Sequence, residues 1–151
     1  MRLTTKGRYA VTAMLDLALH HSCEPVSVYD VAERQGISSA YLEQLFARIR
    51  RAGLLESVRG PGGGYLFKRD ISEITVSDIV TAVGEGVDVT RCHGAADCHD
   101  GSQCLTHDLW AQLSDQIDSY LKDITLASLV DRIEPRPHAD KGANRLVARH
   151  L

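Results

Sequence analysis

The chain has 151 residues, of which 44% are hydrophobic and 25% charged, and its net charge is −3. It is long enough to bury the core of one or two small domains, and these proportions are typical of globular proteins. No apolar run approaches the roughly 20 residues that a membrane-spanning helix needs, and the N-terminus lacks a signal-peptide stretch. We therefore expect a soluble, cytoplasmic protein with no membrane partner.

The small net charge conceals three segments of different sign. Residues 1–69 contain ten Lys and Arg against six Asp and Glu, residues 70–134 contain three against thirteen, and residues 135–151 contain four against one. A basic first half in an acidic protein indicates a local nucleic-acid surface. Uneven solvation of two faces would produce the same pattern, so both interpretations stay open on charge alone.

A first helix is predicted near the N-terminus. Thr4 or Thr5 can cap it, and apolar residues at three- and four-residue spacing continue to about His21. Pro25 disfavours helical backbone in the residue before it, so the helix should have ended by then. Cys23 lies in this connection and is expected to be a small buried side chain, not a metal ligand.

Two short helices joined by a tight turn are predicted over residues 28–52. Ser27 and Ser38 are suitable N-caps, and Gly36 and Gly53 can adopt the left-handed conformation that ends a helix. Two helices joined by a short turn containing glycine form the helix-turn-helix unit. The sequence therefore predicts a helix-turn-helix whose second helix would read DNA.

Two strand-like segments follow this unit directly. They are LLESV and YLFKR, joined by the glycine-rich loop RGPGGG at residues 59–64. The loop is not expected to bind a nucleotide, because a strand follows it and no Gly-Lys-Ser/Thr is present. A helix-turn-helix followed by a β-hairpin is a winged helix.

The second half predicts a short helix, an irregular loop, a long helix and a tail. Thr75 can cap the short helix, and the cysteine-rich segment after it lacks periodicity. Apolar residues then step by three or four from Leu105 to Ile124, and such a stripe at the end of a small domain often pairs with a second copy. We therefore expect a homodimer, with residues 135–151 as a mobile polar tail.

Three of the four cysteines lie in the segment CHGAADCHDGSQCLTH. Clustered thiols in a reducing compartment bind metal more often than they form disulfides. The spacing of Cys92, Cys98, Cys104 and His107 would let a loop of small residues wrap around an inorganic centre. Cys104 and His107 are placed at the start of the long helix, as neighbours on one face, where the helix N-terminus would lower the pKa of the Cys104 thiol.

Four segments together resemble the IscR family of iron–sulfur cluster regulators. They are MRLTTKGRYAVTAMLDLAL, QGIS with YLEQLF, VRGPGGGYLF and the Cys-x5-Cys-x5-Cys-x2-His spacing, within about residues 1–130. The resemblance implies a mainly α-helical winged helix-turn-helix transcription factor, chiefly a repressor. It implies a DNA-binding domain at residues 1–83, a cluster loop and dimerisation helix at residues 84–134, and the tail.

The resemblance also implies a [2Fe–2S] cluster. Cys92, Cys98, Cys104 and His107 would hold it, and the iron–sulfur assembly machinery would donate it. Plentiful cluster would then repress the genes that build clusters. His93 and His99 flank these ligands and are expected to face solvent.

By the same resemblance, the dimer binds palindromic double-stranded operator DNA. The implied contacts are Ser38, Tyr41, Glu43, Gln44, Arg59, Gly62, Gly63 and Gly64. In the major groove Gln44 can pair with adenine and Glu43 can accept from cytosine, whereas Arg59 would enter the minor groove and the glycines would allow close approach. Ala40 departs from the family pattern, where a serine is expected, and this makes the operator preference less certain.

Two other functions use some of the same residues. Three cysteines and one histidine are also a zinc ligand set, which would make the chain a zinc-stabilised DNA-binding module. An iron–sulfur redox protein would use the same cluster, but it would have no need of a DNA-reading first half. No nucleophile–base pair or pair of carboxylates stands out, so an enzyme is not expected.

Overall fold

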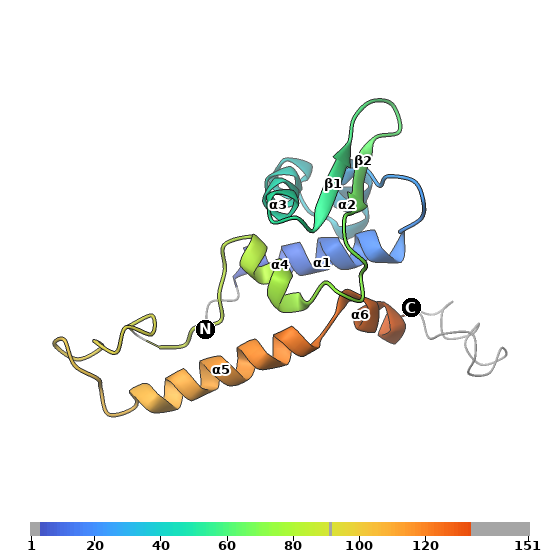
Figure 1. Ribbon diagram of the computed structural model, residues 1–151. Coiled ribbons are helices and arrows are strands. Elements are labelled where there is room, and N and C mark those ends of the chain that lie inside the picture. The colour runs from blue at the N-terminus through green and yellow to red at the C-terminus, as the bar shows by residue number, and fades with distance from the viewer. Residues whose placement is uncertain (1–3, 91, 134–151) are drawn as a thin grey trace.

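The computed structural model describes residues 4–90 and 92–133, which form six helices and one two-stranded sheet (Figure 1). The elements in chain order are α1 (Thr5–Leu19), α2 (Val28–Gln35), α3 (Ser39–Arg51), β1 (Leu55–Val58), β2 (Gly64–Phe67), α4 (Val76–Ala82), α5 (His107–Asp123) and α6 (Leu126–Ile133). This order confirms the predicted mainly α-helical winged helix-turn-helix. The predicted tail lies outside the described residues. Within the described ranges, no helix is both long and apolar enough to cross a membrane.

Helix α1 lies at the centre of the core and contacts α2, α3, α4 and α6. The small residues Ala10 and Ala13 are fully buried on it and let the neighbouring helices approach closely. The largest fully buried side chains come from all parts of the fold and include Met14, Leu42, Phe46, Ile49, Leu55, Ile74, Ile79 and Leu126.

The predicted caps of the helix-turn-helix are present. The Ser27 hydroxyl accepts the Asp30 N–H at 3.1 Å, and the Ser38 hydroxyl accepts the Tyr41 N–H at 3.4 Å. Gly36 adopts φ of +65°, the left-handed conformation that turns the chain from α2 into α3. These local signals fix the direction in which α3 leaves the turn.

The wing is an antiparallel hairpin in which Leu55 pairs with Phe67 and Val58 with Gly64. Its second strand is also bound to the α1–α2 connection, because Val26 and Tyr65 exchange backbone hydrogen bonds of 3.0 and 2.8 Å. Strand β2 is therefore bonded to β1 on one side and to the α1–α2 connection on the other, and the hairpin loop projects from the domain (Figure 1).

The long helix differs from its prediction at both ends. It begins at His107, so Leu105 lies before it and is fully exposed, and it ends at Asp123. Helix α6, which follows α5 directly, was not predicted from the sequence. There Thr125 and Ser128 each accept the other's backbone N–H, at 3.1 and 3.2 Å, and this reciprocal cap starts a new helix that buries Leu126 against α1.

The expected burial of Cys23 is wrong. This cysteine follows the end of α1 in the bent connection to α2, and its side chain is exposed. The segment carries no apolar neighbour spacing that would turn the side chain inward, so residue type alone misled the prediction.

An ion pair between a buried aspartate and a partly exposed arginine joins α1 to α2. Asp16 on α1 is 2% exposed, and its carboxylate accepts hydrogen bonds from Arg34 at 2.7 and 3.1 Å and from Gln35 at 2.7 Å. Burial favours the neutral acid, but these hydrogen bonds outweigh it and hold the pKa of Asp16 below its ordinary value. The carboxylate therefore stabilises the fold in its ionised form.

We expect Asp16→Asn to lower the free energy of unfolding by about 2 kcal/mol at pH 7, because Arg34 would lose its charged acceptor. The folded pKa lies below the unfolded one, so this stabilisation is present above about pH 4 and is lost as the pH falls through the folded pKa. Urea unfolding at fixed protein concentration measures both effects. The exposed Asp123→Asn is the control, with a change below about 0.5 kcal/mol. If the loss of unfolding free energy in Asp16→Asn did not change with pH, the ionised Asp16 would not be the source of the stabilisation.

Candidate metal centre and nucleic-acid interface

The cysteine-rich loop joins α4 to α5 and lies at the end of α5 remote from α6 (Figure 1). Three non-glycine residues in it, His93, Ala96 and Asp100, adopt left-handed φ of 53°, 59° and 47°, and Gly94 and Gly101 adopt 82° and 84°. Repeated left-handed residues coil the backbone tightly. This coil brings Cys92 and Cys98, which are six residues apart in the sequence, to one side of the loop.

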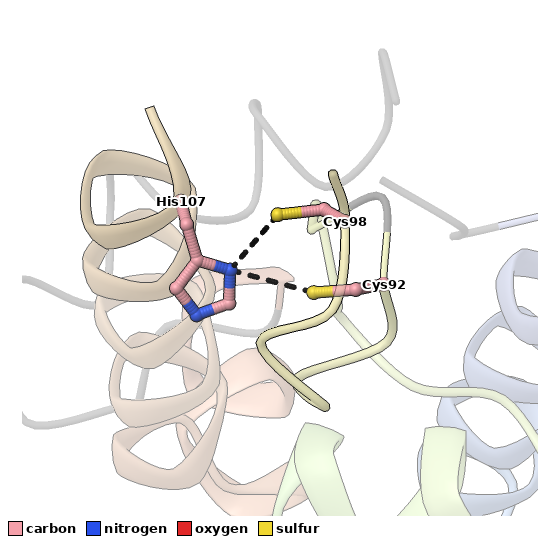
Figure 2. A group of neighbouring side chains, drawn as sticks. All are labelled: Cys92, Cys98 and His107. Carbon is pink, nitrogen blue, oxygen red and sulfur yellow. Dashed lines mark hydrogen bonds between the residues drawn. The ribbon is translucent and has the colours of Figure 1, made fainter. Parts of the chain in front are cut away.

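Figure 2 shows the group that results, in which Cys92 and Cys98 face His107. The His107 Nδ1 atom lies 3.4 Å from the Cys92 sulfur and 3.7 Å from the Cys98 sulfur. All three donor atoms lie within 4.8 Å of one another, and His107 is only 7% exposed at the first position of α5. Two thiols and an imidazole are a donor set for zinc or for an iron–sulfur centre.

Cys104 lies beside this group but outside it. Its backbone N–H donates to the Cys98 sulfur at 3.0 Å, while its own sulfur lies 3.9 Å from the Thr106 hydroxyl. The predicted position of Cys104 on the first turn of α5 is wrong, because the helix begins at His107 and the chain makes a turn between the two residues. A two-residue shift of the helix start separates the side chains that the spacing placed on one face.

The thiol of Cys92 ionises easily. Its partial burial opposes ionisation, but the backbone N–H groups of Ala96, Gly94 and Asp97 and the Thr90 hydroxyl outweigh this and lower its pKa to about 7. A thiolate is the form that binds metal. The loop backbone that positions this sulfur therefore also prepares it as a ligand.

Cys98 and Cys104 influence each other in opposite directions. The Cys98 thiol lowers the pKa of Cys104, with further help from Thr106, and the same contact raises the pKa of Cys98. The predicted direction for Cys104 is thus confirmed, but its largest cause is the neighbouring Cys98 thiol, followed by the backbone N–H of Thr106.

The residues that order the start of the loop were not predicted from the sequence. The Asp88 carboxylate accepts the N–H and the hydroxyl of Thr90 at 2.7 and 2.6 Å, and the Thr90 hydroxyl accepts the Gly94 N–H at 2.8 Å. The signal was present as Asp-Val-Thr, a pattern typical of side-chain-to-backbone turns. His93 and His99 are exposed, as predicted.

Helix α3 presents a polar face to solvent. Glu43 and Gln44 are exposed on it, as are Ser39, Ala40 and Arg48, and the opposite face is buried. Ser38 is also exposed, but its hydroxyl already accepts the N–H that caps the helix. The predicted reading face therefore exists as a surface, with Ser38 at its edge in a structural role.

Tyr41 differs from its neighbours because it is half-buried. Its ring packs edge-on against the ring of Tyr9 on α1, with centroids 6.0 Å apart and an interplanar angle of 77°. Such a pair fixes the direction of a ring. The position of Tyr41 is thus set by α1, a contact that no local sequence pattern could have predicted.

Arg59 is exposed at the start of the wing loop, and Gly62 adopts a left-handed φ of 72° at its tip. A methyl group at Gly63 would lie 2.3 Å from the Val58 carbonyl oxygen, and one at Gly64 would lie 2.2 Å from the Val26 carbonyl oxygen. These distances are far below van der Waals contact, so the hairpin itself requires glycine at both positions, whatever the wing touches.

Known proteins resemble the chain along most of its length. The Rrf2 family, described as an iron-dependent transcriptional regulator, matches residues 3–132. The HTH-type transcriptional regulator IscR of Yersinia pseudotuberculosis is 58% identical over 95% of this chain and 88% of that protein. The solved structure of T. potens IscR has a TM-score of 0.74 at 39% identity, covering 93% of each chain. CymR, the global cysteine regulator of B. subtilis, has a TM-score of 0.75 at 30% identity, covering 87% of this chain and 98% of that one.

We expect Gly64→Ala to lower the free energy of unfolding by about 1–3 kcal/mol, because the added methyl group forces the hairpin away from the Val26 carbonyl. Urea unfolding measures the loss, and amide hydrogen exchange at Tyr65 should become faster because its bond to Val26 opens. Gly86→Ala is the matched control, since a methyl group there meets nothing within 4 Å. Equal effects of the two substitutions would contradict the packing argument.

Proposed function

Because the chain belongs to the Rrf2 family of iron-dependent transcriptional regulators, we propose that it controls iron–sulfur cluster biogenesis genes, mainly as a repressor, by sensing a cluster that it binds. Like its relatives, the chain is a DNA-binding transcriptional regulator. It is not an enzyme. The observation that carries the sensing proposal is the convergence of two thiols and an imidazole at the start of α5. Since its operators lie on the chromosome, the regulator would act in the cytoplasm.

The proposed cofactor is a [2Fe–2S] cluster held by Cys92, Cys98, Cys104 and His107. The first, second and fourth of these already face one another, and the backbone N–H of Cys104 donates to the Cys98 sulfur, so the third thiol belongs to a residue in contact with the group. A bound cluster would supply a centre whose presence follows the supply of iron and sulfide. The iron–sulfur assembly machinery is the proposed donor.

The proposed active form is a homodimer paired through α5. That helix leaves large apolar side chains in solvent, namely Leu109, Trp110, Leu113 and Tyr120. Exposed apolar patches of this kind mark protein contacts. A two-fold dimer would bind palindromic DNA whose half-sites lie one helical turn or a multiple of it apart.

In this proposal, residues 1–83 bind DNA and residues 84–134 hold the cluster and the dimer contact. Tyr41, Glu43 and Gln44 would lie in the major groove, with Ser38 at its edge, and Arg59 with the backbone of Gly62, Gly63 and Gly64 would approach the minor groove. Three arginines in the last turn of α3, Arg48, Arg50 and Arg51, add positive charge near this surface. Phosphates attract such side chains without regard to sequence.

Structural zinc is the second candidate for the metal site, because the same thiol and imidazole donors suit it. Zinc would stabilise the loop without reporting on iron supply, so DNA binding would not change with cluster status. An elemental analysis separates the two candidates.

Anaerobically purified protein should show visible charge-transfer bands and contain about two iron and two sulfide per chain, the content of one [2Fe–2S] cluster. Ala substitution of Cys92, Cys98 or His107 should abolish both signals, and Cys104→Ala tests the fourth ligand in the same way. Cys23→Ala is the matched control, because this exposed thiol lies outside the loop. Colourless protein with about one zinc per chain would reject the sensing proposal.

Arg59→Ala should weaken binding to duplex DNA and lower the slope of log affinity against log salt by about one, as expected for the loss of one cationic contact. Fluorescence anisotropy across a salt series measures the slope. Arg132→Ala on α6 removes the same charge far from the wing and should leave the slope unchanged (Figure 1). A normal slope in the Arg59 variant would exclude this arginine from the interface.

A further inference from the structure

The chain reaches the metal loop from the winged helix through residues 83–90, which we call the link segment. Its first part is rigid, because Gly84 adopts a left-handed φ of 78° and the N–H groups of Gly84 and Glu85 donate to Thr81 at 2.9 Å and Val80 at 3.1 Å. These bonds are the pattern that caps a helix C-terminus. Glu85 is therefore held at the end of α4, seven positions before Cys92.

Two elements of the DNA-binding domain are bonded to this cap. The Glu85 carboxylate accepts the backbone N–H of Thr4 at 3.0 Å and also the Thr4 hydroxyl, at the N-cap residue of α1. Arg48 near the end of α3 donates to the carbonyl of Val83 at 3.2 Å. The link segment thus contacts α1 and the recognition helix within three consecutive residues.

The other end of the link segment is bonded to α5 and to the cysteine-rich loop. The Val89 N–H donates to the Ser114 hydroxyl of α5 at 2.9 Å, two turns after His107 on the same helix. Thr90 accepts the Gly94 N–H inside the loop at 2.8 Å. A displacement of the loop therefore reaches the link segment through both the chain and α5.

The contacts on the DNA side lie at opposite ends of α3. Arg48 bonds the link segment near the C-terminus of that helix, and the ring of Tyr9 on α1 packs against Tyr41 near its N-terminus. Glu85 bonds to Thr4, and Tyr9 lies five residues further along the chain, so two contacts and the first part of α1 join Glu85 to Tyr41. Both ends of the reading face are thereby connected to the link segment, which leads to the first cysteine of the loop.

Space is available for such a displacement. A hollow of about 550 Å³ separates the start of α1 from the link segment and the loop, with Lys6 on one side and Asp88 and His93 on the other. In the described part of the chain, Glu85 makes the hydrogen bonds that cross it. A shift of the loop that carries the link segment with it would therefore strain the Glu85–Thr4 contact.

We propose that Glu85 and Arg48 are positioning residues that transmit the state of the metal loop to the recognition helix. This inference rests on the proposed function, which requires that metal and DNA affinity be coupled. A purely structural alternative is that Glu85 only caps α1, as an acidic group at a helix N-terminus does. That role would affect stability but not the coupling.

The experiment compares DNA affinity of anaerobic protein with its iron–sulfur centre loaded and removed. The probe is a duplex selected from a random-sequence pool by the loaded wild-type protein. Allosteric couplings typically change affinity by about 5- to 150-fold. We expect Glu85→Ala and Arg48→Ala each to reduce the loaded-to-empty affinity ratio at least about threefold, while iron and sulfide per chain stay at the wild-type value. Glu85→Gln, which keeps one acceptor oxygen, should give an intermediate ratio and replaces Glu85→Ala if that variant fails to fold.

Reciprocity supplies a second readout, because DNA must then stabilise or labilise the bound metal to the same degree. Loss of visible absorbance in a chelator, with and without the duplex, should respond to DNA in the wild type and respond less in the Glu85 and Arg48 variants. Glu73→Ala is the control, an exposed carboxylate away from the link segment. Wild-type coupling in both Glu85 and Arg48 variants would overturn this inference alone, whereas wild-type protein without any coupling would overturn the proposed function as well.

Discussion

The carboxylate of Asp16 is buried between α1 and α2, where it must stay paired with Arg34, because an unpaired buried charge costs several kcal/mol. This requirement fixes the orientation of α1 against the helix-turn-helix. The helices α3, α4 and α6 also pack on α1, and its N-cap residue Thr4 bonds to Glu85. A change in the position of α1 would consequently displace α3, the link segment and α6 together.

The metal loop follows a different rule from the core. Its three thiols are only partly buried, and its backbone includes non-glycine residues in the left-handed region, each of which costs about 1–2 kcal/mol. Hydrogen bonds to Thr90 and Asp88 offset part of that cost. Metal–ligand bonds would offset the rest, so the order of the loop and the occupation of the site should rise and fall together.

The winged helix could be predicted because its caps and turn depend on residues close together in the sequence. Contacts between residues far apart in the sequence could not be predicted in this way. Ser27, Ser38 and Gly36 act within one turn of where they stand, so caps and turn could be predicted from the sequence. The Thr4–Glu85 contact joins residues 81 positions apart, and the sequence around either residue does not predict it. For the metal site, spacing identified the donors, but the helix start that separates Cys104 from His107 depends on how the loop coils. The cap that starts α6 was visible as Thr-x-x-Ser, yet the apolar stripe before it concealed the break.

Helix α5 combines two requirements that explain its unusual exposure. Its first residue is a candidate metal ligand, and its Asp118 accepts a hydrogen bond from Ser77 of α4 at 3.2 Å, so the second half of the helix is attached to α4. Between these points its apolar side chains face water, at a cost of about 25 cal/mol for each Å² that a partner could cover. In the proposed dimer, α5 pairing would remove that cost. It would also set the distance between the two reading faces, since α6 anchors each helix to its own α1. One rigid helix would thus define both the metal geometry and the operator spacing.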